Sequence, residues 1–296
     1  MSIGFDFSIF TSPFLVTVLL YAAAVGVMTG ICASVLGVNL VLKRYSMIGD
    51  GLSHVGFLAL AIAAVFGVSG QNELYVTVPV VVLAAFLLMW LSSSGKLKGD
   101  AATALVSVGT MAVGYIIFSI AGTGAGDVCA GLFGASILNI SKSDLIACSV
   151  ITALVLCVYV CFYKQIFSVT FDESFARASG INVSAFNMLL SALIAVTVVI
   201  GMKLIGAVMI SAVIVIPAVT AMRLFKSFRA VVVSSGVISV LSFLLGFLFA
   251  VTFTVQKSDS VTVMLPVGAT VVCFEILVLI IASVISKLKA NKKTVV

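Results

Sequence analysis

Charged residues are scarce in this chain of 296 residues: Asp, Glu, Lys and Arg together make up 9% of it. Hydrophobic residues make up 62%, and the mean hydropathy is +1.36. Water-soluble domains carry about 25% charged residues, so this composition excludes a soluble globular protein and predicts a polytopic membrane protein. A spanning helix needs about 20 apolar residues, which leaves room for about eight to ten spans and for no separate soluble domain. We therefore expect a single transmembrane domain over 1–296.

Several motifs with a defined chemistry are absent. There is no Gly-x-x-x-x-Gly-Lys-Ser/Thr loop, so the chain does not bind ATP in the usual way, and no His-Glu-x-x-His, which argues against an intramembrane zinc protease. The six cysteines form no Cys-x-x-Cys pair and most fall in apolar runs, so we interpret them as packing residues. The net charge of +6 comes from Lys and Arg spread over short connections. This distribution fits membrane topology and lipid headgroups better than binding of nucleic acid.

Nine apolar runs have the length of a spanning helix. They lie at 14–41, 47–67, 74–92, 101–121, 144–163, 184–201, 204–222, 230–252 and 261–286. Only Gly201, Met202 and Lys203 separate the sixth run from the seventh, so a single broken helix is an alternative there. The pattern predicts an all-α membrane protein with about nine spanning helices, within a range of eight to ten.

Basic residues orient the predicted helices, because they occur in every second connection. They are Lys43 and Arg44; Lys96 and Lys98; Lys164 and Arg177; Arg223, Lys226 and Arg229; and Lys287, Lys289, Lys292 and Lys293 near the C-terminus. The connections between these carry few positive charges. By the positive-inside rule the N-terminus lies outside and the C-terminus in the cytoplasm.

One predicted cytoplasmic connection, at 164–183, contains the pattern of a short helix at about 171–181. Asp172 and Glu173 stand near its start, Arg177 stands near its end and Gly180 follows as a stop signal. Acidic residues in the first turn and basic residues in the last stabilise a helix, and glycine commonly ends one. A capped amphipathic helix facing the cytoplasm predicts a docking element for a partner protein. The alternative is a helical loop that binds no partner.

His54 is the only histidine of the chain, and it follows Asp50 by four residues inside an apolar run. This spacing places both side chains on one face of a helix. A carboxylate in the hydrocarbon region costs roughly 2.5 to 3.5 kcal/mol, so the pair needs a physical reason. A carboxylate with an imidazole indicates a divalent transition metal or a proton as the ligand. The alternative is a hydrogen-bonded pair that packs two helices without metal.

Two ligands are too few to hold a transition metal against water. If two copies of the chain meet about a two-fold axis near His54, the pairs combine into two carboxylates and two imidazoles. Four such ligands suit Zn²⁺ and, with water or bidentate carboxylates, Mn²⁺ or Fe²⁺. Two-fold homodimers are also the commonest oligomers, so we expect a homodimer.

Two further acidic residues are weaker candidates for the pathway. Glu275 stands midway along the last apolar run, where it lines a pathway or, as we favour, pairs with a neighbouring helix. Asp127 lies in the outer connection 122–143 and either steers cations or is a solvated turn residue. A short outer helix is expected at 132–140.

Several segments resemble the permease subunits of ABC importers for manganese, zinc and iron ions, the ABC-3 type. The segment at 40–54 reads LVLKRYSMIGDGLSH, and the likeness continues through 132–134, 171–181, 202–207, 216–218 and 266–270. The resemblance implies a type II ABC importer-like permease in the plasma membrane of a bacterium, which forms a homodimer and has no permanently bound cofactor. It implies two cytoplasmic ATP-binding subunits, an extracellular or periplasmic metal-binding protein, and Asp50 and His54 as ligands of the transported ion. In the family the segment at 171–181 is the coupling helix, which implies contact with the ATPase through Asp172, Glu173, Phe175, Ala176, Arg177 and Gly180.

The leading hypothesis is therefore the membrane subunit of an importer that moves Zn²⁺ or Mn²⁺, with Fe²⁺ as a further candidate, by alternating access. Such a chain is not an enzyme, because a separate subunit hydrolyses ATP. One alternative is a secondary transporter or channel that uses Asp50 and His54 as a proton relay and needs no ATPase. Another is an ABC permease for metal chelates, which requires a wider cavity than a compact Asp/His site.

Overall fold

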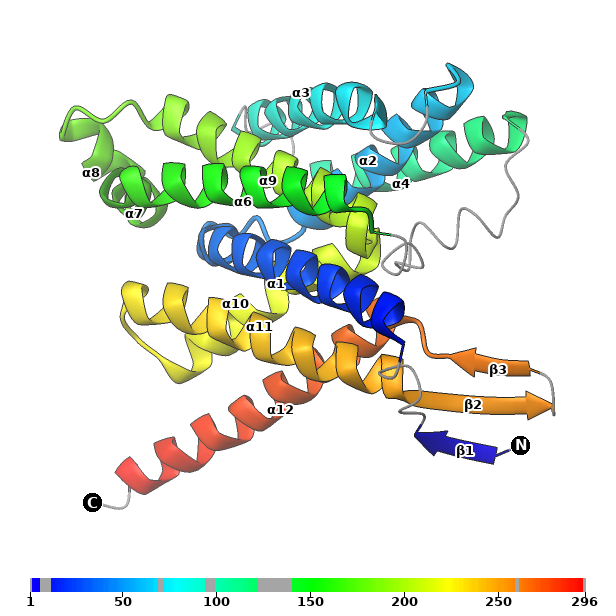
Figure 1. Ribbon diagram of the computed structural model, residues 1–296. Helices are drawn as coiled ribbons and strands as arrows, with labels where there is room; N and C mark the ends of the chain where they lie inside the picture. The colour runs from blue at the N-terminus through cyan, green and yellow to red at the C-terminus, as the bar shows by residue number, and fades with distance from the viewer. Residues whose placement is uncertain are drawn as a thin grey trace.

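The computed structural model describes residues 2–5, 12–68, 72–93, 99–121, 140–258 and 261–294. Long helices form a bundle, and a small sheet lies beside one end of it (Figure 1). In chain order the elements are β1 (Ser2–Phe5), α1 (Pro13–Leu42), α2 (Ile48–Val65), α3 (Glu73–Ser93), α4 (Gly99–Ile120), α6 (Lys142–Cys161), α7 (Tyr163–Phe171), α8 (Glu173–Ala178), α9 (Val183–Ile205), α10 (Ala207–Leu224), α11 (Phe228–Thr252), β2 (Phe253–Ser258), β3 (Val261–Met264) and α12 (Val267–Thr294).

The predicted number of spanning helices is confirmed for the described part of the chain. Nine helices there are long and apolar enough to cross a membrane, namely α1 to α4, α6 and α9 to α12. The remaining two, α7 and α8, are short and follow one another in the connection between α6 and α9. The fold is thus the helical membrane bundle that the hydropathy pattern predicts.

The boundary between the sixth and seventh spanning helices lies a few residues later than predicted. Met202 and Lys203 belong to the last turns of α9, and Gly206 alone separates α9 from α10. Gly206 has φ of 102° and ψ of 152°, a backbone conformation that other residues rarely adopt. Two distinct helices are therefore present, joined by one residue.

A three-stranded antiparallel sheet was not predicted. Its strand order is β1-β2-β3, with Ser2 opposite Gln256 and Val255 opposite Val263. The predicted last span began at residue 261, whereas α12 begins at Val267. The apolar run there starts with β-branched residues, which favour a strand, and apolar character by itself does not distinguish the two structures.

The two ends of the bundle carry different elements. In Figure 1 the sheet and the N-terminus lie at one end, which we call the sheet end, and α8 and the C-terminus lie at the other, which we call the α8 end. Termini at opposite ends agree with an odd number of spans. The basic connections then predict that the α8 end faces the cytoplasm.

Helix α1 runs through the centre of the bundle and packs against α6, α9, α10 and α11. Glycines permit its closest contacts. A Cβ atom on Gly37 would lie 1.8 Å from the carbonyl oxygen of Ile214 in α10, and one on Gly26 would lie 1.9 Å from the Phe243 ring in α11. These contacts hold α1 close against α10 and α11.

Candidate metal centre and coupling helix

Asp50 and His54 project from the first half of α2 and lie together, as their spacing predicts. The Nε2 atom of His54 is 3.6 Å from Oδ2 of Asp50. The Asp50 side chain is 46% exposed and that of His54 is 18% exposed. The pair thus lies at the edge of a single chain, with its carboxylate open to a neighbour.

Three glycines set the position of α2. A Cβ on Gly49 would lie 3.0 Å from Ile214 in α10, and one on Gly51 would lie 2.6 Å from Thr103 in α4. A Cβ on Gly56 would lie 2.8 Å from Met202 in α9. Because three helices approach the backbone of α2 at these positions, its rotation and hence the direction of the Asp50–His54 face are fixed.

In the structure, as in the sequence, Asp50 and His54 are too few ligands to hold a transition-metal ion. Among the described residues, no three His, Cys, Asp or Glu side chains gather into a group that could hold a metal ion. Nδ1 of His54 is buried and has no hydrogen-bond partner there. One copy of the chain therefore offers one carboxylate and one imidazole, with acceptor capacity to spare on both.

Glu275 is the other acidic side chain inside a spanning helix that the sequence singles out. It is 1% exposed, and neither of its carboxylate oxygens has a hydrogen-bond partner within the described part of the chain. The favoured pairing with a neighbouring helix is thus not found there. Glu275 also does not join Asp50 and His54 in a larger group. Asp127 and the short helix expected at 132–140 fall outside the described residues.

A helix is present within the predicted range 171–181, but it is shorter than predicted: α8 covers only Glu173–Ala178, and Phe171 ends α7. Asp172 accepts hydrogen bonds of 2.9 Å from the backbone N–H groups of Ser174 and Phe175, which satisfies two free donors of the first turn. Gly180 ends the segment with φ of 81°. Ala176 is buried against Val169 and Val183, while Phe175 is 63% exposed. In the list Asp172, Glu173, Phe175, Ala176, Arg177 and Gly180, only Ala176 is buried, so α8 presents the others at the surface.

A polar cluster that the sequence did not predict ties α8 to the bundle. Nζ of Lys43, just after α1, lies 2.9 Å from Oε1 of Glu173 and also donates to Asn187 in α9. Asn187 in turn donates to Glu173 over 3.1 Å. The Lys43 side chain is 8% exposed. In the sequence, Lys43 is a basic residue that indicates the orientation of the helices. Its partners Glu173 and Asn187 are distant along the chain, so residue spacing does not predict the cluster.

The pKa shifts in this cluster follow from burial and pairing. Burial lowers the pKa of the Lys43 amine below its ordinary value, although the hydrogen bond and charge of Glu173 act in the opposite direction. Burial by itself would raise the pKa of Glu173. Lys43 and Asn187 donate hydrogen bonds to the Glu173 carboxylate, and together with nearby positive charge they hold its pKa below its ordinary value.

A second polar network joins the same face of α1 to α6 and α7. Asn39, one turn before Lys43, donates to the Tyr159 hydroxyl over 3.1 Å and accepts from the Thr170 hydroxyl over 3.2 Å. All three side chains are buried. Since Thr170 lies in the last turn of α7, this network holds the segment that leads directly into α8.

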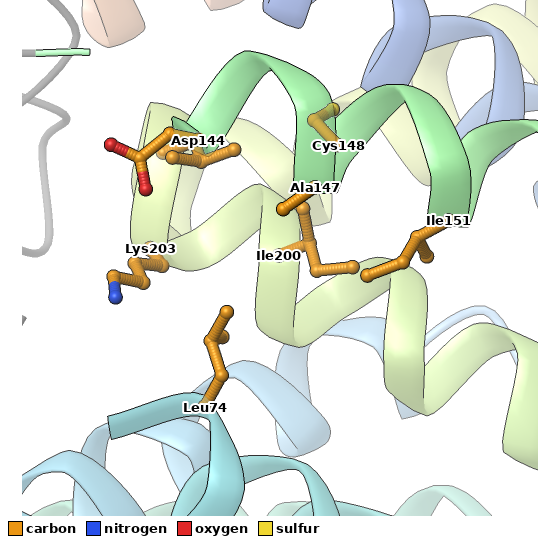
Figure 2. Close-up of a pocket in the computed structure, with 8 residues that line it drawn as sticks. Leu74, Asp144, Ala147, Cys148, Ile151, Ile200 and Lys203 are labelled. Carbon is orange, nitrogen blue, oxygen red and sulfur yellow. The ribbon is translucent and has the colours of Figure 1, made fainter. Parts of the chain in front are cut away.

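A small cavity lies between α3, α6 and α9 near the sheet end (Figure 2). It measures about 10 Å³, which is room for about one water molecule. Its lining includes the charged side chains of Asp144 and Lys203, which lie on one side in Figure 2, and apolar side chains such as Leu74 and Ile200. Lys203 also lies 3.6 Å from Glu73. The small volume and the lysine exclude this cavity as a metal centre.

Comparison with known proteins supports the fold and identifies the family. The model of the ABC 3 transport family matches residues 15–286. The high-affinity zinc uptake system membrane protein ZnuB of Haemophilus influenzae is 26% identical over 247 residues, which cover 83% of this chain and 93% of that protein. The manganese transport system membrane protein MntC of Halalkalibacterium halodurans is 27% identical over 241 residues, which cover 81% of each.

A solved structure has the same architecture. PsaBC from Streptococcus pneumoniae in complex with Fab matches with a TM-score of 0.76 over 93% of this chain and 92% of that chain, at 24% identity. The likeness confirms the arrangement of the helices described above. Because the family model extends from the first spanning helix to the last, the chain belongs to the ABC 3 transport family.

Proposed function

We propose that this chain is the membrane subunit of an ATP-driven importer that carries divalent transition-metal ions, Zn²⁺ or Mn²⁺ with Fe²⁺ as a further candidate, across the plasma membrane of a bacterium. The whole chain acts as one transmembrane permease domain. The observation that carries the proposal is the contact between Asp50 and His54 on one face of a spanning helix. Relatives named for zinc uptake and manganese transport support the choice of ion.

A second copy of the chain completes the ion site. The Asp50 carboxylate is half exposed and the neighbouring His54 side chain is 18% exposed, so both leave coordination capacity at the edge of each copy. Two copies related by a two-fold axis supply two carboxylates and two imidazoles to one ion. The two negative charges offset the charge of the ion as it loses its water, and the imidazole nitrogens favour a transition metal over Ca²⁺ or Mg²⁺.

Helix α8 is the coupling helix, and it rests on a separate cytoplasmic ATP-binding subunit. Its exposed Phe175 and Arg177 offer an apolar and a charged contact to that partner. Closure of two such subunits on ATP moves the α8 helices, and the Lys43–Glu173 contact passes the movement to α1. Alternating access follows when the bundles tilt and open the ion site to the other face. A metal-binding protein outside the cell delivers the ion.

A proton relay through Asp50 and His54 has less support. A relay needs a succession of titratable groups, and no third His, Cys, Asp or Glu joins the pair within the described residues. A secondary transporter also has no use for a capped helix displayed beside the bundle.

Uptake of radioactive zinc and manganese into vesicles that hold the complete transporter tests the proposal. We expect uptake that needs ATP, and we expect both Asp50→Asn and His54→Ala to abolish it while the protein stays folded. Asp144→Asn is the matched control, since Asp144 is a capping carboxylate near the sheet end. Undiminished uptake in Asp50→Asn, or uptake that a protonophore stops and ATP does not drive, refutes the proposal.

A further inference from the structure

A large cavity opens between α1, α6, α7 and α11, away from Asp50 and His54. Its volume is about 570 Å³, within the range of sites that hold small organic molecules. The residues around it come from the C-terminal end of α6, the start of α7 and the start of α11. All three lie toward the α8 end of the bundle in Figure 1.

One side of this cavity is polar and positively charged. Lys164 and Arg229 both line it, both are exposed, and neither forms an ion pair with another described residue. The positive charge of Arg229 reaches the Tyr163 hydroxyl, although burial dominates and raises the pKa of Tyr163. Oε1 of Gln165 is buried here without a hydrogen-bond partner. None of the described residues that line the cavity is acidic, so its charge attracts an anion.

The other side is aliphatic and opens outward. Val160 is 70% exposed and Val233 is 66% exposed, whereas Leu156 and Val35 line the deeper part. In a spanning bundle, exposed valines at this level face hydrocarbon chains. The cavity therefore combines an anion-attracting rim at the predicted cytoplasmic surface with a wall suited to an alkyl chain.

We propose that this cavity binds an anionic phospholipid, with its phosphate between Lys164 and Arg229 and an acyl chain along Val160 and Val233. Basic pockets between spanning helices on the cytoplasmic side are the setting in which anionic headgroups bind. The free Oε1 of Gln165 accepts a hydrogen bond from a hydroxyl of the headgroup. The inference does not depend on which ion the protein carries.

A lipid at this place touches the part of the molecule that positions α8. Tyr159 lines the cavity and also accepts the hydrogen bond from Asn39, which in turn accepts from Thr170 in the last turn of α7. A lipid bound in the cavity therefore contacts Tyr159, one member of the hydrogen-bond network that joins α1 to α7. We expect it to hold α7, and with it α8, in the observed position.

Lipid retention by the purified full chain in nanodiscs tests the site. Native mass spectrometry would compare phosphatidylglycerol with phosphatidylcholine as the retained lipid. The double variant Lys164→Gln, Arg229→Gln should retain phosphatidylglycerol about 30-fold less tightly, because each basic residue near the surface contributes about 1 kcal/mol to anionic lipid binding. Arg223→Gln, Lys226→Gln is the matched control. Both residues are exposed, Arg223 in the last turn of α10 and Lys226 in the connection before α11, and neither lines the cavity.

Three outcomes would overturn the inference. They are equal retention of the two lipids by the natural chain, an equal loss in the control variant, and displacement of the lipid by inorganic phosphate as readily as by added phosphatidylglycerol. If the double variant fails to fold, Val233→Trp keeps the test open, because it blocks the aliphatic wall without removing charge. This variant should also release phosphatidylglycerol, and full retention by it counts against the site.

Discussion

The Lys43 ammonium group lies 2.9 Å from the Glu173 carboxylate, so the end of α1 is joined to the first turn of α8 by an ion pair. Lys43 is nearly buried, whereas Glu173 is about half exposed. The short connection after Lys43 leads into α2, which carries Asp50 and His54. This contact therefore joins the proposed coupling helix, through the short connection after α1, to the helix that carries the proposed ion ligands.

If the chain has the proposed function, breaking the Lys43–Glu173 contact should uncouple ATP hydrolysis from ion transport. Glu173→Ala leaves the buried Lys43 ammonium without its charged partner, at a cost of about 1 to 3 kcal/mol. We expect the ratio of metal ions imported to ATP hydrolysed to fall by about tenfold, which corresponds to about 1.4 kcal/mol. Transport and ATP hydrolysis measured together in vesicles would show this. A double-mutant cycle with Lys43→Met isolates the interaction energy of the Lys43–Glu173 pair. If the effects of the two substitutions on the transport ratio simply add, the pair has no coupling role.

Acid should loosen the junction between α1 and α8. The pKa of Glu173 is lowered when α8 is docked, so docking is favoured while the carboxylate is charged. That contribution is complete above the ordinary glutamate pKa of about 4.3 and is lost as the pH falls through the lower docked-state value. Because Glu173 is about half exposed, we expect an effect of less than about 1 kcal/mol. Hydrogen exchange of the α8 amides against pH measures it, and Glu173→Gln should remove the pH dependence.

The two-fold ion site predicts that Asp50 of one copy lies near Asp50 of another. Asp50→Cys, in a chain whose natural cysteines are replaced, should form a covalent dimer under mild oxidation and a Cd²⁺-bridged one without it. The carboxylate position is 46% exposed, so the new thiol is accessible. Ser143→Cys, exposed at the start of α6, is the control and should stay monomeric on a denaturing gel. A dimer of equal yield at both positions would speak against the two-fold axis near α2.

Close packing of α1 on α10 should make Gly37 intolerant of substitution. In Gly37→Ala the new methyl group would lie 1.8 Å from the Ile214 carbonyl oxygen, so the helices must separate. Overpacking of this kind costs about 1 to 3 kcal/mol, which should lower the thermal midpoint of the purified protein. Gly109→Ala is the matched control, because nothing lies within 4 Å of its new methyl group and alanine favours a helix by about 1 kcal/mol.

Hydropathy and end signals predicted most of the fold, because membrane helices must be long and apolar and α8 carries its caps in its own sequence. The predicted helix boundaries were wrong where the same apolar composition fits either a strand or a helix. The segment at 261–264 begins with three β-branched residues yet continues the apolar run of α12, so composition did not separate strand from helix there. The break between α9 and α10 depends on the backbone of Gly206, not on the polar Lys203. The Asp50–His54 contact followed from spacing alone. The partners of Lys43 did not, because Glu173 and Asn187 meet it only after α7 to α9 have folded back onto α1.

Gly206, the single residue between α9 and α10, can act as a hinge between these two helices. Asn187, near the start of α9, contacts the Lys43–Glu173 pair, and Ile214 of α10 packs against Gly49, next to Asp50. We expect a tilt of α9 at the α8 end to pivot at Gly206 and to reach the backbone beside Asp50 through Ile214, which packs against both Gly49 of α2 and Gly37 of α1. Any residue with a side chain at Gly206 would be strained at this φ, so we expect transport to slow in such a variant.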